Sequence, residues 1–281
     1  MKQKLKIDVT QNNLVFGDCK DWLHYIDDNS VDLIYIDPPF FSQKNYEIVW
    51  GNGYEVRSFE DRWKGEINHY TGWMRDRLID AHRVLKNTGS ILLHCDYHAN
   101  HHLRLLLDEL FGEENFINEI IWSYFKPHAS KKTFPTNHDN IYWYSKKKNK
   151  QTFNKEFSLE PYDDKAKKRY DKKDKDGKRC KYYYNSDGTF RIAYMKEGKP
   201  TDILKIPFVQ GTSSERRGYR TQKPEKLLSK LIQCCSNEGD IVLDFFGGGG
   251  GGKKGGGGGK KKVVLKPVFF NPLVIIFYLI G

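Results

Sequence analysis

The stretch VDLIYIDPPF, residues 31–40, decides the fold that the sequence predicts. Its first six residues are apolar or aromatic with a single acid, which is typical of a buried strand in a parallel sheet. Asp37 follows, and then two prolines, which fix the backbone angle φ and remove two N–H donors. Because ligands of open parallel sheets lie beyond the carboxyl ends of the strands, Asp37 marks a candidate site.

The next hundred residues continue an alternation of strands and helices. Apolar residues recur at helical spacing over residues 73–85, and we expect this helix to end at a left-handed cap formed by Gly89. Residues 90–95 predict the next buried strand, and residues 103–111 predict a helix closed by Gly112. This alternation predicts an α/β fold with a mostly parallel sheet covered by helices on both faces.

A second acid follows a predicted strand near the other end of the chain. Residues 224–235 begin with proline and place apolar residues on one face, which predicts a helix. Residues 241–244 predict a buried strand that ends on Asp244, and glycines begin at Gly247. Since glycine lets a backbone approach a ligand closely, we expect Asp37 and Asp244 to open into one crevice.

The residues after the first strand suit chemistry on an amine. A carboxylate together with a nearby carbonyl oxygen can accept both hydrogens of an –NH2 group, and the ring of Phe40 offers a face for a planar base. Amines attached to a heteroaromatic ring are poor nucleophiles, so accepting their hydrogens in the transition state favours reaction. Taken alone, the DPP sequence is also compatible with a simple turn.

Composition limits the class of protein. The chain has 281 residues with a formal net charge of +11, which suits a polyanion such as nucleic acid. Its five cysteines are odd in number and lack CxxC spacing, which favours a reducing cytosol over a disulfide framework or a zinc ribbon. The apolar segment 272–280 is too short to span a bilayer. We therefore expect a soluble cytoplasmic protein without a membrane partner.

The chain changes character over residues 125–207. Residues 151–200 hold 14 Lys/Arg against 9 Asp/Glu, with tyrosines at 182–184. Two interpretations stay open: a solvated insertion, or a surface that follows phosphates with cations and meets bases with aromatic rings. The candidate DNA-contacting residues are Lys131, Lys132, Lys167, Lys168, Arg169, Arg216 and Arg217.

Together these segments resemble the β-group of amino-DNA methyltransferases found in bacterial restriction–modification systems. In that group the catalytic motif precedes the cofactor motif, which is the order of Asp37 and Asp244 here. The resemblance extends over about residues 14–250. It rests on residues 17–23, 30–40, 83–90, 93–98, 111–122, 138–141, 221–224 and 244–250.

The resemblance implies a Rossmann-like, S-adenosylmethionine-dependent methyltransferase fold with permuted motif order and an inserted target-recognition region. Its parts would be residues 1–124 for catalysis, 125–207 for target recognition and 208–281 for the cofactor. It implies double-stranded DNA as the substrate, with the target base rotated out of the duplex. The implied base-holding residues are Asp37, Pro38, Pro39 and Phe40, and the implied cofactor residues are Asp18, Asp37, Lys223, Asp244, Phe246, Gly248 and Gly250.

Several features leave the function open. Residues 247–262 consist only of Gly and Lys, so we expect the helix that relatives form there to be absent. No Asp or Glu follows Asp244 to bind a ribose. An Asp before Pro-Pro favours adenine N6 by analogy, with cytosine N4, a catalytically silent DNA-binding relative and an RNA methyltransferase as alternatives. A cognate restriction endonuclease and a homodimer are compatible partners that the sequence does not decide.

A cluster of ring nitrogens invites a metal interpretation. We expect no metal there, because the spacing is not HExxH and the resembling group uses none. Polar residues at this point instead suggest capping of the following helix. The cluster consists of His94, Cys95, His98, His101 and His102.

Overall fold

A computed structural model gives the fold. It describes residues 13–16, 18–41, 67–126, 131–196, 198–216, 222–247 and 273–278. The chain divides into two compact units, one made of residues 1–153 and 202–281 and the other of residues 154–201.

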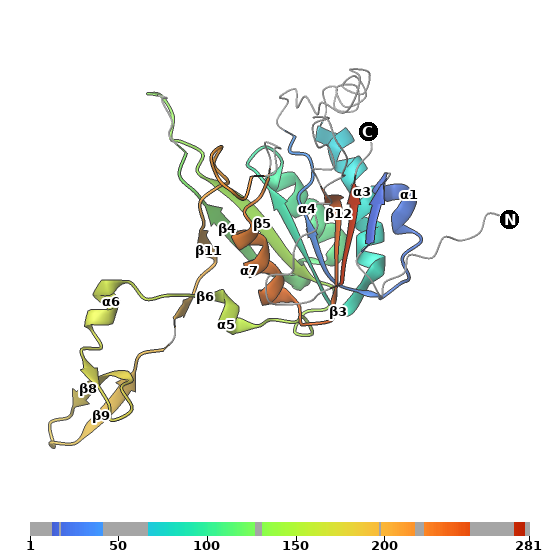
Figure 1. Cartoon of the computed structure of the whole chain (residues 1–281). Coiled ribbons are helices and arrows are strands. Elements are labelled where there is room, and N and C mark those ends of the chain that lie inside the picture. Colours follow the sequence, from blue (N-terminus) through green and yellow to red (C-terminus); the bar gives the residue numbers. More distant parts are fainter. Residues whose placement is uncertain are drawn as a thin grey trace. The chain divides into compact units, whose positions relative to one another are not determined.

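The first unit is built on a mixed sheet whose described strands have the order β1-β13-β12-β2-β3-β5-β4-β11 (Figure 1). Neighbours from β1 to β3 are parallel, β5 is antiparallel to β3 and β4, and β11 is parallel to β4. This confirms the predicted Rossmann-like, mostly parallel α/β fold. The strands are β1 (Asn13–Phe16), β2 (Val31–Ile36), β3 (Leu85–Cys95), β4 (Phe116–Ser123), β5 (His138–Ser145), β11 (Ile203–Lys205), β12 (Ile241–Gly247) and β13 (Leu273–Tyr278).

Helices cover the sheet through apolar stripes. Neighbours along the chain pack together, α1 with α3 and α3 with α4, over a core that includes Ile34, Ile91 and Leu243. Leu33 and Val242 alternate with these core residues and are buried outside that core cluster, so the second face of the sheet is also covered. The helices are α1 (Cys19–Leu23), α3 (Ile67–Val84), α4 (Asn100–Phe111), the 3-10 turn η1 (Glu113–Asn115) and α7 (Glu225–Cys235).

The end of α3 corrects one expectation. Gly89 is not a left-handed cap: the positive-φ glycines of the described chain do not include it, and it lies inside β3. The last carbonyls of α3 are bonded instead by backbone N–H groups of the loop before β2, with Ser30 N donating to Val84 O at 2.8 Å. Gly112 does close α4, with φ of 89°.

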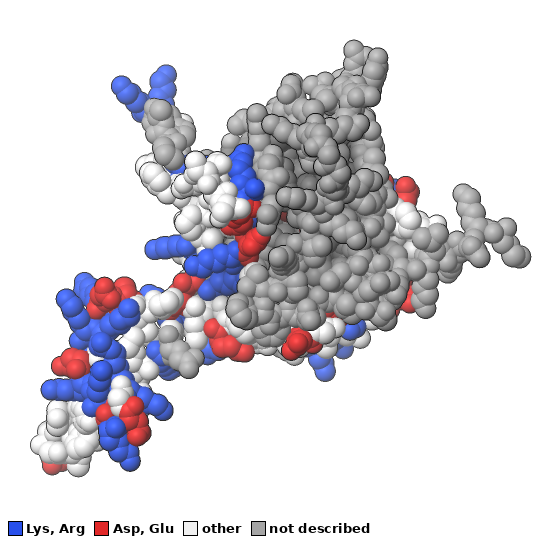
Figure 2. Space-filling view, viewed as in Figure 1, with Lys and Arg blue, Asp and Glu red and all other residues white. Residues whose placement is uncertain are grey.

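The second unit is small and antiparallel. Three strands pair in the order β7-β8-β9, and β6 pairs with β10. Figure 2 shows Lys and Arg side chains over much of this unit. It lies within the predicted region 125–207, whose boundaries stay a prediction. Its elements are α5 (Lys155–Ser158), β6 (Leu159–Glu160), α6 (Asp164–Lys168), β7 (Lys172–Lys173), β8 (Arg179–Tyr184), β9 (Phe190–Tyr194) and β10 (Lys199–Pro200).

Candidate active site

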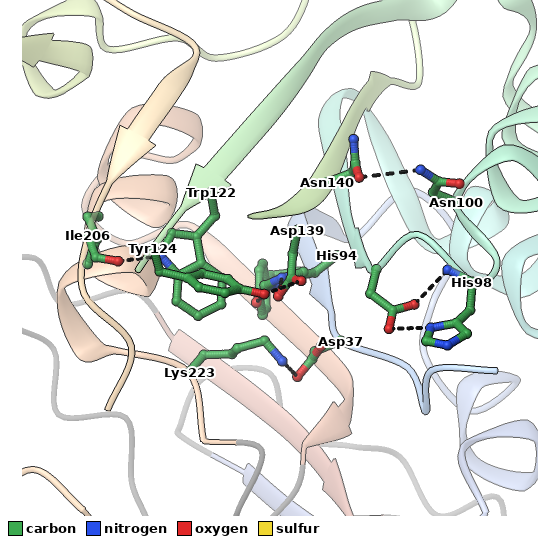
Figure 3. Close-up of polar contacts among 12 residues, drawn as sticks. Asp37, His94, His98, Asn100, Trp122, Tyr124, Asp139, Asn140, Ile206 and Lys223 are labelled. Atoms are coloured by element: carbon green, nitrogen blue, oxygen red, sulfur yellow. Dashed lines mark hydrogen bonds and ion pairs between the residues drawn. The ribbon is translucent and has the colours of Figure 1, made fainter. Parts of the chain in front are cut away.

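Asp37 leaves the carboxyl end of β2 and meets a lysine from a distant part of the chain. Lys223, just before α7, donates from Nζ to Oδ2 of Asp37 at 2.5 Å (Figure 3). The same Nζ lies 4.9 Å from the centre of the Phe40 ring, a cation–π distance. Within the described residues, Oδ1 of Asp37 is buried and has no hydrogen-bond partner. Because buried oxygens are nearly always bonded, Oδ1 is a ready acceptor for a ligand.

Asp244 stands on the strand next to β2. The two strands pair in parallel at Leu243 and Ile34, and Oδ1 of Asp244 accepts the N–H of Phe246 at 2.9 Å. The strand continues to Gly247, with a register shift after Asp244, so the acid precedes the strand end that we expected it to occupy. Burial, with a smaller contribution from the charge of Asp37, raises the pKa of Asp244 to about 7.

The two acids therefore share one electrostatic environment. Lys223 lowers the pKa of Asp244 while Asp37 raises it, so all three charged groups act on one another. A site with two carboxyl groups and one ammonium group favours a cationic ligand. Asp37 and Asp244 thus belong to neighbouring parallel strands and interact through their charges, and their opening into one crevice stays a prediction.

A polar network lies beneath this site. Tyr35 Oη and His94 Nδ1 are 2.9 Å apart, and His94 Nε2 lies 3.3 Å from Oδ2 of Asp139. Tyr124 donates its hydroxyl to Oδ1 of Asp139 at 2.8 Å. The His94 ring also lies 6.0 Å from the Phe40 ring, centre to centre. Figure 3 shows Tyr124, Asp139 and His94 beside the Lys223–Asp37 pair.

Asp18 has a structural position at the start of α1. Its Oδ1 accepts the N–H of Lys20, which caps the helix, and both of its oxygens accept from Nη2 of Arg77 at 2.7 and 2.9 Å. Arg77 is 2% exposed, and its guanidinium lies 3.9 Å from the centre of the Trp73 ring. The predicted contact of Asp18 with the cofactor stays a prediction.

Comparison with known families now identifies the chain's family. A family model described as DNA methylase, covering N6 and N4 enzymes, matches residues 31–251, which include both Asp37 and Asp244. The chain belongs to this DNA methylase family. The family resemblance drawn from the motifs is confirmed.

The chain is similar to curated DNA methyltransferases over most of its length. It is 29% identical to the type II methyltransferase M.HinfI of Haemophilus influenzae, over 84% of this chain and 59% of that protein. It is 28% identical to M.HpaI of Haemophilus parainfluenzae, over 80% and 60%. The E. coli K12 DNA adenine methyltransferase YhdJ is 28% identical, over 83% and 70%. The chain thus spans about three fifths of the length of the first two relatives.

Solved structures share the fold of this chain. The PvuII DNA methyltransferase, described as cytosine-N4-specific, matches with a TM-score of 0.57 and 15% identity, over 98% of this chain and 86% of that chain. A protein of Thermus thermophilus, described as a putative DNA modification methylase, matches with a TM-score of 0.53 and 15% identity, over 96% and 90%. At these identities the likeness shows the fold alone.

The remaining predicted site residues of the chain lie in different parts of the structure. Phe246 is 6% exposed and its ring lies 5.3 Å from that of Trp73. Gly248, Gly250 and Arg217 lie outside the described residues, as does the Gly/Lys segment after Gly247. The other DNA candidates are at least partly exposed: Lys131 and Lys132 beyond β4, Lys167 and Lys168 in α6, Arg169 just after it, and Arg216 before α7. Their contacts with DNA stay predictions.

The histidine cluster corrects a second expectation. The N-cap of α4 is Ala99, and the N–H of His101 in the first turn bonds to Oδ1 of Asn100 at 2.7 Å rather than to a side chain of the cluster. His94 instead joins the network beneath the site, while His98 bonds to Oδ2 of Asp96 at 2.7 Å. Among the described residues, no group of three metal-ligating side chains is placed to hold an ion. No described helix is both long and apolar enough to cross a membrane.

Sequence reasoning missed Asp139 as a site residue. It lies on β5, far in sequence from His94 on β3, and the antiparallel pairing of these strands brings the two together. No spacing rule links positions so far apart. The available signal was an acid two residues before the apolar and aromatic run 141–144, because a buried carboxylate requires partners.

Proposed function

We propose that this chain is a DNA methyltransferase that moves the methyl group of S-adenosylmethionine to the N6 amine of adenine. The observation that carries the proposal is that Asp37 and Asp244 belong to neighbouring parallel strands and interact through their charges, with Lys223 bonded to Asp37 and acting on Asp244. The family match supports it, because it contains both acids.

The residues present fit the cofactor. The buried, unpartnered Oδ1 of Asp37 and the perturbed carboxyl group of Asp244 favour positive charge, and S-adenosylmethionine carries a sulfonium and an ammonium group. When bound, this cofactor supplies an electrophilic methyl group. Asp244 would hold the cationic end, and Lys223 would meet the carboxylate of the cofactor.

On the base side, Asp37 acts on the amine. Its free oxygen accepts a hydrogen of the exocyclic –NH2, which favours the pyramidal, nucleophilic form in the transition state. The ring of Phe40 provides a stacking face. Since an amine inside a duplex cannot reach this edge, the chain must act on a base rotated out of the stack.

Adenine is the proposed target, by analogy. The E. coli relative is named as an adenine methyltransferase, and Asp rather than Ser stands before Pro-Pro in this chain. Cytosine N4 is the second candidate, because the matching family model covers both N6 and N4 enzymes. The two targets have the same amine chemistry, so the nucleoside product distinguishes them.

A silent DNA-binding relative is the alternative of another class. It is favoured by the Gly/Lys segment 247–262 and by the lack of an acid after Asp244. Calorimetry with S-adenosylmethionine separates the two: saturable binding supports the enzyme, and no binding supports the silent form.

The predicted target-recognition region, residues 125–207, is proposed to position the DNA. Lys131, Lys132, Lys168 and Arg169 are exposed cations that suit phosphate contacts. The Lys131→Gln/Lys132→Gln double variant should weaken DNA binding and reduce its dependence on salt by about one to two released ions. An unchanged salt slope would remove these two lysines from the interface.

One experiment tests the proposed function directly. Incubation with labelled S-adenosylmethionine and DNA that contains all short sites should yield N6-methyladenine on nucleoside analysis. Asp37→Ala should abolish transfer and leave cofactor binding largely intact. Asp21→Ala, which removes an exposed acid on α1, is the matched control and should be active. Transfer by Asp37→Ala at the wild-type rate would contradict the proposed role of Asp37.

A further inference from the structure

The network beneath Phe40 joins three strands. Tyr35 comes from β2, two residues before Asp37, while His94 comes from β3 and Asp139 from β5. Tyr124, just after β4, completes it, and its backbone N–H bonds to Asn137 O at 2.9 Å. The side chain of His94 is fully buried. The network therefore connects the strand that carries Asp37 to the far half of the sheet.

Its hydrogen bonds are consistent with a single arrangement of protons. An ionised Asp139 only accepts, so it takes the hydroxyl proton of Tyr124 and the Nε2–H of His94. With its proton on Nε2, His94 accepts the Tyr35 hydroxyl at Nδ1. All ring nitrogens and carboxylate oxygens in the network then have partners.

The charges around the network support this arrangement. Burial, followed by the charge of Lys223, lowers the pKa of His94, which keeps the ring neutral. Burial alone would raise the pKa of Asp139, but the hydrogen bonds from His94 and Tyr124 and the charge of Lys223 bring it below its ordinary value. Burial raises the pKa of Tyr35 and of Tyr124, so both hydroxyls stay donors.

The His94 ring is also the contact surface for Phe40. The two ring centres are 6.0 Å apart with planes at 47°, and the edge of Trp122 meets His94 from another side at 5.5 Å. Trp122 is fixed by its indole N–H, which donates to Ile206 O at 2.8 Å. A change in the tilt of His94 would therefore shift the ring of Phe40.

We propose that His94, oriented by Asp139 and Tyr35, is a positioning residue that sets the ring of Phe40 against the base beside Asp37. The inference rests on the proposed function and deepens it, because it names residues behind the base that do not touch the reacting atoms. An apolar side chain would fill the same buried space without the cost of burying an imidazole and a carboxylate. The hydrogen-bonded side chains of Tyr35, His94 and Asp139 lie behind Phe40, which is proposed to hold the base.

The same pair of strands offers a matched control. Trp143 on β5 donates its indole N–H to Oγ of Ser90 on β3 at 3.0 Å, and both residues are buried. Ser90→Ala removes one buried hydrogen bond between β3 and β5, as Tyr35→Phe removes one between β2 and β3. Because the Ser90 hydroxyl bonds to Trp143 rather than to His94 or Asp139, this variant reports the cost to stability alone.

The test combines kinetics with NMR. In single-turnover methyl transfer, Tyr35→Phe and Asp139→Asn should each lower the rate by ~10-fold or more, with dissociation constants for cofactor and DNA within about twofold of wild type. Ser90→Ala should keep the wild-type rate despite a comparable fall in Tm. Nitrogen-15 spectra of the imidazole should show neutral His94 protonated on Nε2, and Asp139→Asn should remove that preference.

The outcomes separate this inference from the proposed function. Rates for Tyr35→Phe and Asp139→Asn that fall no further than for Ser90→Ala overturn the positioning role. A His94 ring protonated on Nδ1, or on both nitrogens, overturns the proposed arrangement. A wild-type protein that transfers no methyl group contradicts the proposed function and this inference with it, whereas an active wild type with unaffected variants contradicts the inference alone.

Discussion

Lys223 Nζ lies 2.5 Å from Oδ2 of Asp37, and Oδ1 of the same carboxylate is buried without a partner in the described part of the chain. One oxygen of the acid is thus held by a cation and the other is available. Lys223 belongs to the segment before α7 and Asp37 to the end of β2, so the contact ties the two motif-bearing halves of the family match together.

The raised pKa of Asp244 predicts how cofactor binding depends on pH. In the free protein this carboxyl group, with a pKa of about 7, is protonated below that pH. A bound ammonium group stabilises the carboxylate and lowers its pKa, so affinity should fall as pH drops through 7, by up to ~10-fold per pH unit. Calorimetry across this range checks the slope, and Asp244→Asn should remove it.

The same shift has an opposite consequence for stability. A carboxyl group whose pKa is higher in the folded state than in the unfolded state binds more protons when folded, so its contribution to stability falls as pH rises from 4 toward 7. Asp244→Asn should therefore raise Tm at alkaline pH while weakening cofactor binding. A lower Tm for Asp244→Asn at every pH would contradict the predicted loss of stability when Asp244 ionises.

Removing the charge of Lys223 should change the pH at which Asp244 titrates. Lys223 lowers the pKa of Asp244, so Lys223→Met should raise it above about 7 and shift the binding profile to higher pH. Lys226→Met, three residues along and exposed, is the matched control and should leave the profile in place. Identical profiles for the two variants would show that Lys223 does not act on Asp244.

Arg77 should be a major determinant of stability. It is 2% exposed and donates to both oxygens of Asp18, to Trp73 O at 3.0 Å and to Cys19 Sγ at 3.2 Å. Arg77→Met should cost on the order of 3 kcal/mol in the free energy of unfolding, because it leaves Asp18 without its cation. Unfolding by denaturant measures this change in the free energy of unfolding.

The control for Arg77→Met is a second arginine on the same helix, α3. Arg75 pairs with Glu109 through exposed side chains, an interaction that solvent screens. Arg75→Met should shift the unfolding midpoint much less than Arg77→Met. Equal shifts would mean that burial of the Arg77 pair contributes little.

The sequence predicted the parts of the fold that depend on local pattern. The strand before Asp37 and the helix closed by Gly112 follow from apolar spacing and a positive-φ glycine, and both are confirmed. Asp37 and Asp244 could be placed at one edge because parallel strands end together. The contact between His94 and Asp139 depends on which strands become neighbours, and chain order does not encode that locally.

Gly89 shows how a correct residue type can be given the wrong reason. The sequence indicated a glycine that must adopt positive φ. In the structure the position needs glycine because there is no room for a Cβ atom. A Cβ at this position would lie 2.8 Å from Cδ2 of Leu85, 3.0 Å from Lys86 O and 3.1 Å from Asp32 O. Both explanations demand glycine, so the sequence alone could not separate them.

The close contacts around Gly89 predict that Gly89→Ala destabilises the protein. Gly72→Ala, the control, should instead stabilise it. Gly89→Ala should lower the free energy of unfolding by about 1–3 kcal/mol, because two of the contacts are with backbone oxygens that cannot move aside easily. Gly72, exposed on α3, has no atom within 4 Å of an added Cβ. Gly72→Ala should stabilise by about 0.5–1 kcal/mol through helix propensity. Denaturant melts of the two variants measure both changes, and a neutral Gly89→Ala would show that β2 and β3 can separate at this point without loss.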